Sequence, residues 1–392
     1  MANPIGLYLH IPFCRGKCPY CDFYSMRADA ACMDTYTQAL QKSLEQWAER
    51  IGRAADTLYL GGGTPSLLGG ARIAALVQTA RDCYGLRGAE ITVECNPSDV
   101  DGHLFEALAG AGVSRISLGL QSAVDEERKA LGRRAGVKEA AASIRLAGAA
   151  GIQNLSLDLM LGIPGQTAES LRRSIDFCTQ AGVCHISAYL LKIEEGTPFA
   201  QRRASLVLPN EDTVCDLYEQ ACEELEAAGF QQYEISNFAR PGFESRHNLK
   251  YWNLSEYMGL GAAAHSYIKN TRYSNLDNII QYSHTMWSQD VASNIRIEGS
   301  EAFGADCVVE SSVNTYMDNV SDYTFTALRT KQGVVFEDFR KRLKNEFWDI
   351  YALQRAEFEM FVQKGYAESD GRHIALTRKG IDISNRIMSL FV

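Results

Sequence analysis

Three cysteines stand close together near the N-terminus of the sequence. Cys14, Cys18 and Cys21 have the spacing C-x3-C-x2-C within LYLHIPFCRGKCPYCDFYS. A zinc site usually pairs two such clusters, and the sequence shows no second one downstream. Three thiols this close, on a loop beside aromatic residues, are also unusual for inert buried cysteines. Soft thiolates suit iron and sulfur, so we expect a 4Fe-4S cluster whose fourth iron is open to another ligand.

A glycine-rich run follows the second predicted strand. The stretch LYLGGGTPSLL carries a strand into three glycines and a Thr-Pro pair. Glycines at a strand end let backbone groups approach a ligand closely, although a plain tight turn is an equal alternative.

Polar side chains mark the ends of three further predicted strands. Glu94 lies in TVECNP, Gln121 in ISLGLQS and Asp158 in LSLDLML. One carboxylate of this kind could be a helix cap or a surface charge. Their recurrence on successive strands favours a shared ligand that needs hydroxyl and carboxylate partners. In KALGRRAG, either Arg133 or Arg134 could bind a carboxylate, and the sequence does not decide between them.

The elements that must position these residues alternate along the first half of the chain. Short aliphatic or β-branched runs alternate with amphipathic runs, which is the pattern of parallel strands joined by crossover helices. The predicted strands are 7–11, 57–60, 91–94, 115–118, 155–159 and 185–190. The predicted helices are 33–51, 71–84, 101–111, 137–150, 168–181 and 211–228. Six β/α units are fewer than the eight of a closed TIM barrel, so we predict an α/β fold with an open, partial (β/α)6 barrel whose site lies at the C-terminal strand ends.

The predicted domains are 1–208, 209–301 and 302–392. The first is the partial barrel. In the second the alternation lapses, and we expect the loop-rich, aromatic run 233–268 to close the barrel mouth. The third has the order helix, helix, hairpin and helix of a winged-helix-like α+β domain. Acidic residues are interleaved with basic ones there, so we favour a protein-contact or lid role over DNA binding.

Charge and cysteine content limit the function classes. The net charge of -9 argues against a nucleic-acid partner held mainly through its phosphates. The N-terminus lacks the features of a secretory signal, and no apolar run approaches the roughly 20 residues of a membrane span. With 11 cysteines and no export signal, we expect a cytoplasmic protein with free or metal-bound thiols.

Taken together, these motifs resemble the radical S-adenosylmethionine superfamily. Its signature is the C-x3-C-x2-C spacing with an aromatic residue before the last cysteine. The further motifs ECNPSD, LGLQS, LDLMLGIPGQT, YEISNFARPGFESRHNLKYW and LTRKGIDISN resemble the branch that contains the oxygen-independent coproporphyrinogen III oxidases and the heme chaperones. The resemblance implies that S-adenosylmethionine chelates the open iron and is cleaved to a 5'-deoxyadenosyl radical. The positions that match cofactor contacts are Tyr8, Tyr20, Gly62, Gly63, Thr64, Glu94, Gln121, Arg133 and Asp158.

Two features separate the members of this branch. The oxidases continue the cysteine motif with one more cysteine, where this chain has Phe23. The chaperones carry an HNxxYW motif, present here as His247, Asn248, Tyr251 and Trp252. The resemblance implies that His247 ligates heme iron, although a histidine beside an asparagine is ordinarily a hydrogen-bonded structural residue.

A second candidate histidine lies in GLGAAAHSY. His265 could line the site, and the family commonly shows GPGAHSY at this place. Ala262 and Ala263 therefore depart from the family pattern.

The resemblance implies a heme chaperone that carries a 4Fe-4S cluster and S-adenosylmethionine and delivers heme to respiratory hemoproteins. The alternatives are an oxygen-independent coproporphyrinogen III oxidase and a related radical methyltransferase. The implied partners are heme, heme-accepting respiratory proteins and an electron donor for the cluster, with at most peripheral membrane contact. The sequence does not decide whether the chain forms a homodimer, or whether the radical is used in an enzymatic reaction.

Overall fold

One large sheet organises the computed structural model, which describes residues 3–288 and 308–392. Its strands follow the order β12-β11-β10-β9-β1-β2-β3-β4-β5-β6-β8-β7, and β1 to β6 are parallel neighbours in chain order. These six are β1 (Ile5–Ile11), β2 (Ala55–Gly62), β3 (Glu90–Cys95), β4 (Arg115–Gln121), β5 (Asn154–Leu161) and β6 (His185–Leu190). All six predicted strands are confirmed, and the sheet stays open as the count of six units predicted.

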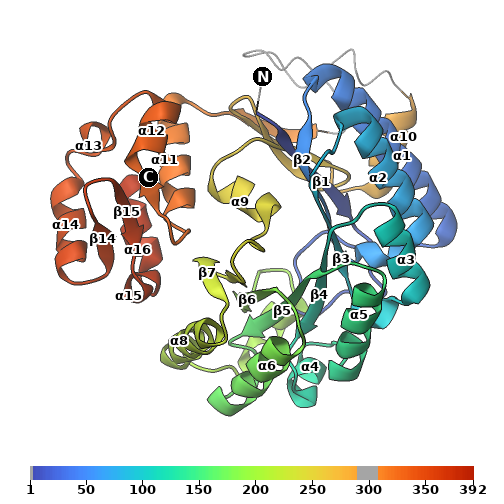
Figure 1. Cartoon of the computed structure of the whole chain (residues 1–392), viewed down its shortest axis with the longest axis horizontal. Coiled ribbons are helices and arrows are strands. Elements are labelled where there is room, and N and C mark those ends of the chain that lie inside the picture. The colour runs from blue at the N-terminus through green and yellow to red at the C-terminus, as the bar shows by residue number, and fades with distance from the viewer. Residues whose placement is uncertain (1–2, 289–307) are drawn as a thin grey trace.

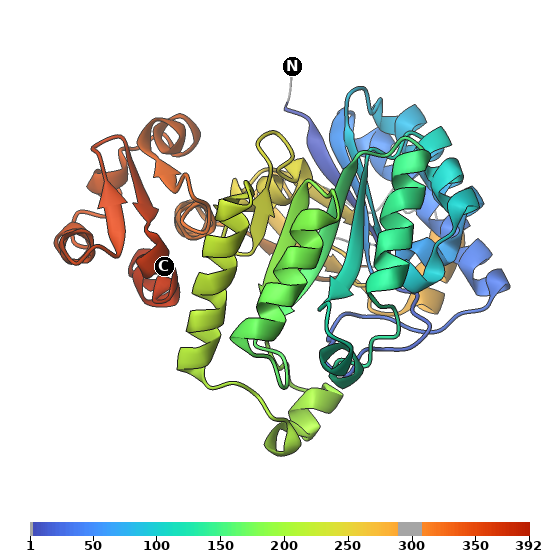
Figure 2. The same cartoon turned by 60° about the horizontal axis from the view of Figure 1, so that its bottom comes forward.

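The crossover helices cover the outer, convex side of this sheet (Figures 1 and 2). They are α1 (Ala30–Ile51), α2 (Gly70–Tyr84), α3 (Gly102–Gly110), α5 (Val137–Ala149), α6 (Ala168–Gln180) and α8 (Glu211–Ala227). Each predicted helix is therefore confirmed, while the short α4 (Asp125–Ala130) was not predicted. Among the helices of the described residues, none combines the length and the hydropathy needed to cross a bilayer.

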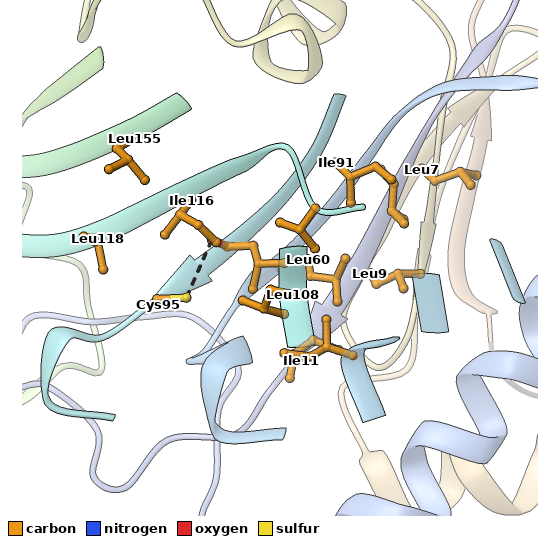
Figure 3. Packing of buried hydrophobic residues seen from close by; sticks show 14 of the residues in the cluster. Leu7, Leu9, Ile11, Leu60, Ile91, Cys95, Leu108, Ile116, Leu118 and Leu155 are labelled. Atoms are coloured by element: carbon orange, nitrogen blue, oxygen red, sulfur yellow. Dashed lines mark hydrogen bonds between the residues drawn. The ribbon is translucent and has the colours of Figure 1, made fainter. Parts of the chain in front are cut away.

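Side chains on the two faces of the sheet differ in polarity. The outward residues of β1 to β5 are aliphatic and pack against the helices, as Leu60, Ile91, Ile116 and Leu155 do in the core cluster that also contains Leu108 of α3 (Figure 3). The alternate residues on the same strands face inward and are largely polar, because successive strand residues point to opposite faces. Examples are Thr57 and Tyr59, Thr92 and Glu94, Arg115 and Ser117, Ser156 and Asp158, and His185 and Ser187.

The middle of the chain extends both edges of the sheet. The expectation that 233–268 is loop-rich was only partly right, because short strands and a helix alternate with the loops of this run. The run includes β7 (Gln231–Glu234), β8 (Asn237–Ala239), α9 (Arg246–Trp252), β9 (Tyr257–Leu260) and β10 (His265–Ile268), followed by β11 (Thr271–Asn275) and α10 (Ile279–Ser288). Strand β9 pairs in parallel with β1, and β8 pairs antiparallel with β6. Strands of three or four residues are too short for sequence periodicity to reveal.

The C-terminal part is a small α+β unit beside the sheet edge (Figure 1). After β12 (Val308–Val313) come α11 (Tyr316–Ala327), β13 (Val334–Val335), α12 (Phe336–Leu343), α13 (Phe347–Ile350), α14 (Arg355–Gln363), β14 (Ala367–Ser369), β15 (His373–Leu376), α15 (Arg378–Ile381) and α16 (Ser384–Met388). The predicted hairpin and its flanking helices are present, and β15 lies between β13 and β14. The predicted boundary at 301/302 lies outside the described residues, and the domain limits stay a prediction.

Ala263 has a left-handed backbone conformation, with φ 60°. A residue with a Cβ is strained in this conformation, and it is the position where the family pattern has glycine. We therefore expect Ala263→Gly to raise the free energy of unfolding by about 0.5–1 kcal/mol, after the entropic cost of glycine is subtracted. The neighbouring Ala262 is buried and is not among the residues with positive φ, so Ala262→Gly should lower it. Denaturant unfolding of both variants measures these changes. A lower free energy of unfolding in Ala263→Gly would contradict the prediction.

Candidate functional site

The three cysteines face a cavity at the C-terminal end of the barrel strands. Cys14, Cys18 and Cys21 lie on the loop after β1 and line a cavity of about 690 Å³. The Cys14 amide donates to the Met26 carbonyl (2.9 Å), which anchors the loop. Within the described residues, no three His, Cys, Asp or Glu side chains gather where a single metal ion would bind. Three thiolates on one loop are a donor set that suits a 4Fe-4S cluster with one iron open to another ligand.

Most of the predicted cofactor contacts line the same cavity. Those on its wall are Tyr20, Gly62, Gly63, Thr64, Glu94, Gln121, Arg133 and Asp158, together with the three cysteines. Two predicted residues, Tyr8 and His247, are not on this wall, and His265 is exposed elsewhere. The polar residues at the ends of the successive strands therefore lie on one cavity wall, as the sequence pattern predicted.

The glycine-rich run connects β2 to the cysteine loop. The Gly63 amide donates to the Ile11 carbonyl (3.0 Å), and a Cβ on Gly63 would lie 2.7 Å from that oxygen. The Thr64 hydroxyl oxygen lies 3.6 Å from Cys14 Sγ. This close approach requires glycine at position 63, so the run is more than a plain turn: it holds the thiol loop against the cavity wall.

A strained residue and an arginine form the next part of the wall. Gln121 has φ 71°, beside a register irregularity between β4 and β5. Arg133 donates to the Gly119 carbonyl, and its other terminal nitrogen lies 3.9 Å from Cys18 Sγ. Both candidate arginines line the cavity, but Arg133 is the one held beside the thiols, whereas Arg134 is exposed. Strain of this kind in a non-glycine residue persists where the surrounding structure enforces it, often at functional sites.

Two buried carboxyl groups face the cavity. Glu94 accepts hydrogen bonds from the Tyr59 hydroxyl (2.7 Å) and the Gly62 amide (3.2 Å). Burial raises the pKa of Glu94 to about 7 despite these donors. Asp158 accepts from the Ser117 hydroxyl (3.1 Å), and burial likewise raises the pKa of Asp158. The cavity can therefore hold at least one carboxyl group in its neutral form near pH 7.

His247 lies at the opposite end of the barrel, on α9. Only 1% of the residue is exposed, and its Nδ1 and Nε2 are hydrogen-bonded to the Thr57 hydroxyl (2.8 Å) and the Tyr251 hydroxyl (2.9 Å). Burial lowers the pKa of His247 to about 3, so the imidazole is neutral. Tyr8 packs beside it, with its hydroxyl 3.0 Å from His10 Nδ1.

Several further residues of the cavity wall were not predicted from the sequence. Arg115, Ser117, Ser187, Tyr189 and Asn248 all line the cavity. The prediction of these strands rests on their aliphatic residues, although RISLGLQ and HISAYL alternate polar and apolar residues. That period of two was the signal for a polar inner face.

The comparisons with known proteins agree with this geometry. The sequence profile of the Radical SAM superfamily matches residues 8–178, and that of the HemN C-terminal domain matches residues 324–383. The heme chaperone HemW of Mycobacterium tuberculosis (strain CDC 1551 / Oshkosh) is 39% identical over 386 residues, which cover 97% of this chain and 92% of the relative. The chain belongs to the HemW family. HemW of Lactococcus lactis subsp. lactis (strain IL1403) is 31% identical over 395 residues, covering 100% of this chain and 98% of the relative.

A solved structure shares the fold of this HemW-family chain. Coproporphyrinogen III oxidase (HemN) from Escherichia coli, a radical SAM enzyme, matches with a TM-score of 0.84 and 22% identity. The match covers 99% of this chain and 90% of that chain. It confirms the partial barrel with its C-terminal unit as the fold.

Glu94 should make stability depend on pH. Its pKa rises from an ordinary 4.5 to about 7, so between these values the folded chain binds more protons than the unfolded chain. The destabilisation by ionised Glu94 is therefore absent below pH 4.5 and complete above pH 7. We expect the chain to lose ~2 kcal/mol relative to Glu94→Gln as the pH rises from 5 to 8, given about 1.4 kcal/mol for each pKa unit. Denaturant unfolding of cluster-free protein measures this, and a difference independent of pH would contradict it.

Substitution of the loop cysteines should cause a selective loss of iron. After anaerobic reconstitution we expect roughly four irons and four sulfides per chain, as in a 4Fe-4S cluster, and a loss of most of both in Cys14→Ser, Cys18→Ser and Cys21→Ser. Cys32→Ser is the matched control, since Cys32 lies on α1 outside the cavity wall. Iron and acid-labile sulfide analysis makes the measurement. Equal loss in the control, or full retention in all three loop variants, would argue against this loop as the cluster site.

Proposed function

We propose that this protein is a heme chaperone that binds heme, a 4Fe-4S cluster and S-adenosylmethionine, and that delivers heme to hemoproteins. The observation that carries the proposal is the match to a heme chaperone over 92% of that relative's length. Phe23, which is 60% exposed on the cavity wall, agrees with it, because the oxidases have a further cysteine at this position.

The residues on the cavity wall suit the two cofactors of the radical SAM superfamily. Cys14, Cys18 and Cys21 would hold the cluster, and the eight wall residues named above would contact S-adenosylmethionine. When bound, the cluster supplies one electron for reductive cleavage of S-adenosylmethionine. The contribution of the chain is to hold that molecule between the glycine run and Asp158, and to keep Arg133 beside the thiols.

Heme ligation by His247 requires a local rearrangement. The imidazole is neutral, which is the form that ligates iron, but both of its nitrogens already have hydrogen-bond partners. An iron at Nε2 must displace the Tyr251 hydroxyl. The C-terminal unit holds the same helix, since Arg329 lies 4.6 Å over the Trp252 ring and Arg342 donates to the Asn253 carbonyl (2.6 Å). We therefore propose that α9 or the Tyr251 side chain moves when heme binds.

The further partners are proposals from the family resemblance. Respiratory hemoproteins are the proposed recipients of heme, and a reductase or reduced carrier is the proposed electron donor. A cytoplasmic location, a contact role of the C-terminal unit and a homodimer stay predictions.

His247→Ala should weaken heme binding by roughly tenfold or more, because it removes the proposed axial ligand. His265→Ala is the matched control, since His265 is exposed and outside the cavity wall. Absorption titration of the anaerobically reconstituted protein with heme measures both, and coproporphyrinogen III is offered separately. Equal affinities in all three proteins would contradict the role of His247. Formation of protoporphyrinogen with release of 5'-deoxyadenosine would contradict the chaperone function.

A second variant tests the same geometry and should change heme affinity in the opposite direction. Tyr251→Phe keeps the ring but removes the hydroxyl that occupies His247 Nε2. We expect heme affinity to rise, because the nitrogen no longer has a competing partner. This outcome also separates a ligand role from simple loss of folding, since a misfolded variant would bind less heme.

A further inference from the structure

A buried arginine lies on the cavity wall, and within the described part of the chain only longer-range electrostatic interactions, chiefly with Tyr59 and Glu90, act on its guanidinium. Arg115 begins β4, is 2% exposed and lines the cavity. Among residues 3–288 and 308–392, no side chain or carbonyl forms a hydrogen bond or an ion pair with its guanidinium, and its Nε is fully buried without an acceptor. A buried guanidinium ordinarily has hydrogen-bonding and charged partners, because removing it from water is costly.

Another buried arginine of the same chain shows the ordinary arrangement. Arg128 is 5% exposed, and it donates to the Ser122 carbonyl (2.7 Å) and pairs with Asp125. The fold therefore satisfies a buried guanidinium where the role is structural. The donors of Arg115 are instead left available to the cavity.

The charges around Arg115 favour a monovalent anion. Glu94 and Asp158 line the same cavity, but neither forms an ion pair with Arg115. Arg133 adds a positive charge to the wall, while Glu90 and Asp158 are the carboxyl groups that act electrostatically on Arg115. Because these carboxyl groups repel an anion, a phosphate dianion would meet more repulsion at Arg115 than a single carboxylate would.

The position of Arg115 separates this subsite from the predicted S-adenosylmethionine contacts. Those contacts lie at the C-terminal strand ends, and Gln121 ends the strand that Arg115 begins, roughly 20 Å away along the backbone. Ser117 and Ser187 line the cavity between these two levels, where their hydroxyl groups interact with Asp158. Asn248 of α9, the residue after His247, also lines the cavity. The deep end of the cavity therefore lies beside the helix that carries the proposed heme ligand.

We propose that the deep end of the cavity is a subsite for a single carboxylate, bound by Arg115, and that its occupant is a propionate side chain of heme. The assignment of heme as the source rests on the proposed function, whereas the carboxylate subsite rests on Arg115 and the cavity. A guanidinium is well suited to this task, because two parallel N–H donors match the two oxygens of a carboxylate.

The experiment compares heme with heme dimethyl ester, in which both propionates are neutral. We expect Arg115→Gln to weaken heme binding roughly tenfold or more, while the variant and the unmodified chain bind the ester equally. S-adenosylmethionine affinity should be unchanged. Ligand-free Arg115→Gln should melt at the same or a higher temperature, because an unpaired buried charge is removed. The matched control Arg128→Gln should melt at a lower temperature and keep its heme affinity, since Arg128 has structural partners outside the cavity wall.

Three results would overturn the subsite. These are equal heme affinity with and without Arg115, an equal loss for heme and its ester, and a lower melting temperature of ligand-free Arg115→Gln, which would make Arg115 a structural counter-ion. If the unmodified chain binds no heme, the proposed function fails, and sodium propionate then tests the subsite alone. Propionate, but not propionamide, should raise the melting temperature of the unmodified chain and not that of Arg115→Gln. If propionate shifted the melting temperature of both proteins equally, or of neither, the subsite would be overturned.

Discussion

The structure depends on a chemical difference between the two faces of one sheet. On β4 and β5 the outward Ile116, Leu118 and Leu157 pack in the core, while Ser117 and Asp158 face the cavity. A shift of one residue in strand register would place a carboxylate in the core and a leucine in the cavity, so burial fixes the register strongly. The polar inner face also gives the cavity a wall of hydrogen-bonding and ionisable side chains. Ligand binding in this barrel is thus built into the alternation of its strands.

Helix α9 closes the N-terminal end of the same barrel. The buried carboxylate of Glu90 accepts from the backbone amides of Arg246 (3.1 Å) and His247 (3.0 Å), which secures the start of the helix. Tyr59 links this helix to the cavity wall, since its ring stacks on His247 at 5.1 Å between centroids and its hydroxyl donates to Glu94. A change at α9 is therefore physically connected to the residues proposed to contact S-adenosylmethionine. This connection gives a structural reason why one chain would combine heme with radical SAM cofactors.

Sequence reasoning could predict those parts of the fold that depend on local pattern. The six strands, the crossover helices and the cysteine loop follow from periodicity, helix-ending glycines and thiol spacing. The short strands β7 to β10 could not be predicted, because long-range pairing rather than local preference determines them. The spacing of the thiols predicted the open iron, but no local signal showed that Arg133 points inward or that both nitrogens of His247 are occupied. Arg115 could have been recognised from the alternation in RISLGLQ, whereas its lack of a partner could only come from three-dimensional structure.

The proposed chaperone function requires that the chain transfers heme to an acceptor and does more than store it. The most direct measurement loads the reconstituted protein with heme and compares two acceptors, an apo b-type respiratory cytochrome and apomyoglobin, which only captures heme that has dissociated. A chaperone should transfer heme to the cytochrome faster than apomyoglobin withdraws it, and the rate should rise with cytochrome concentration because transfer occurs in a complex. Identical rates with both acceptors, independent of acceptor concentration, would show passive dissociation and contradict the account.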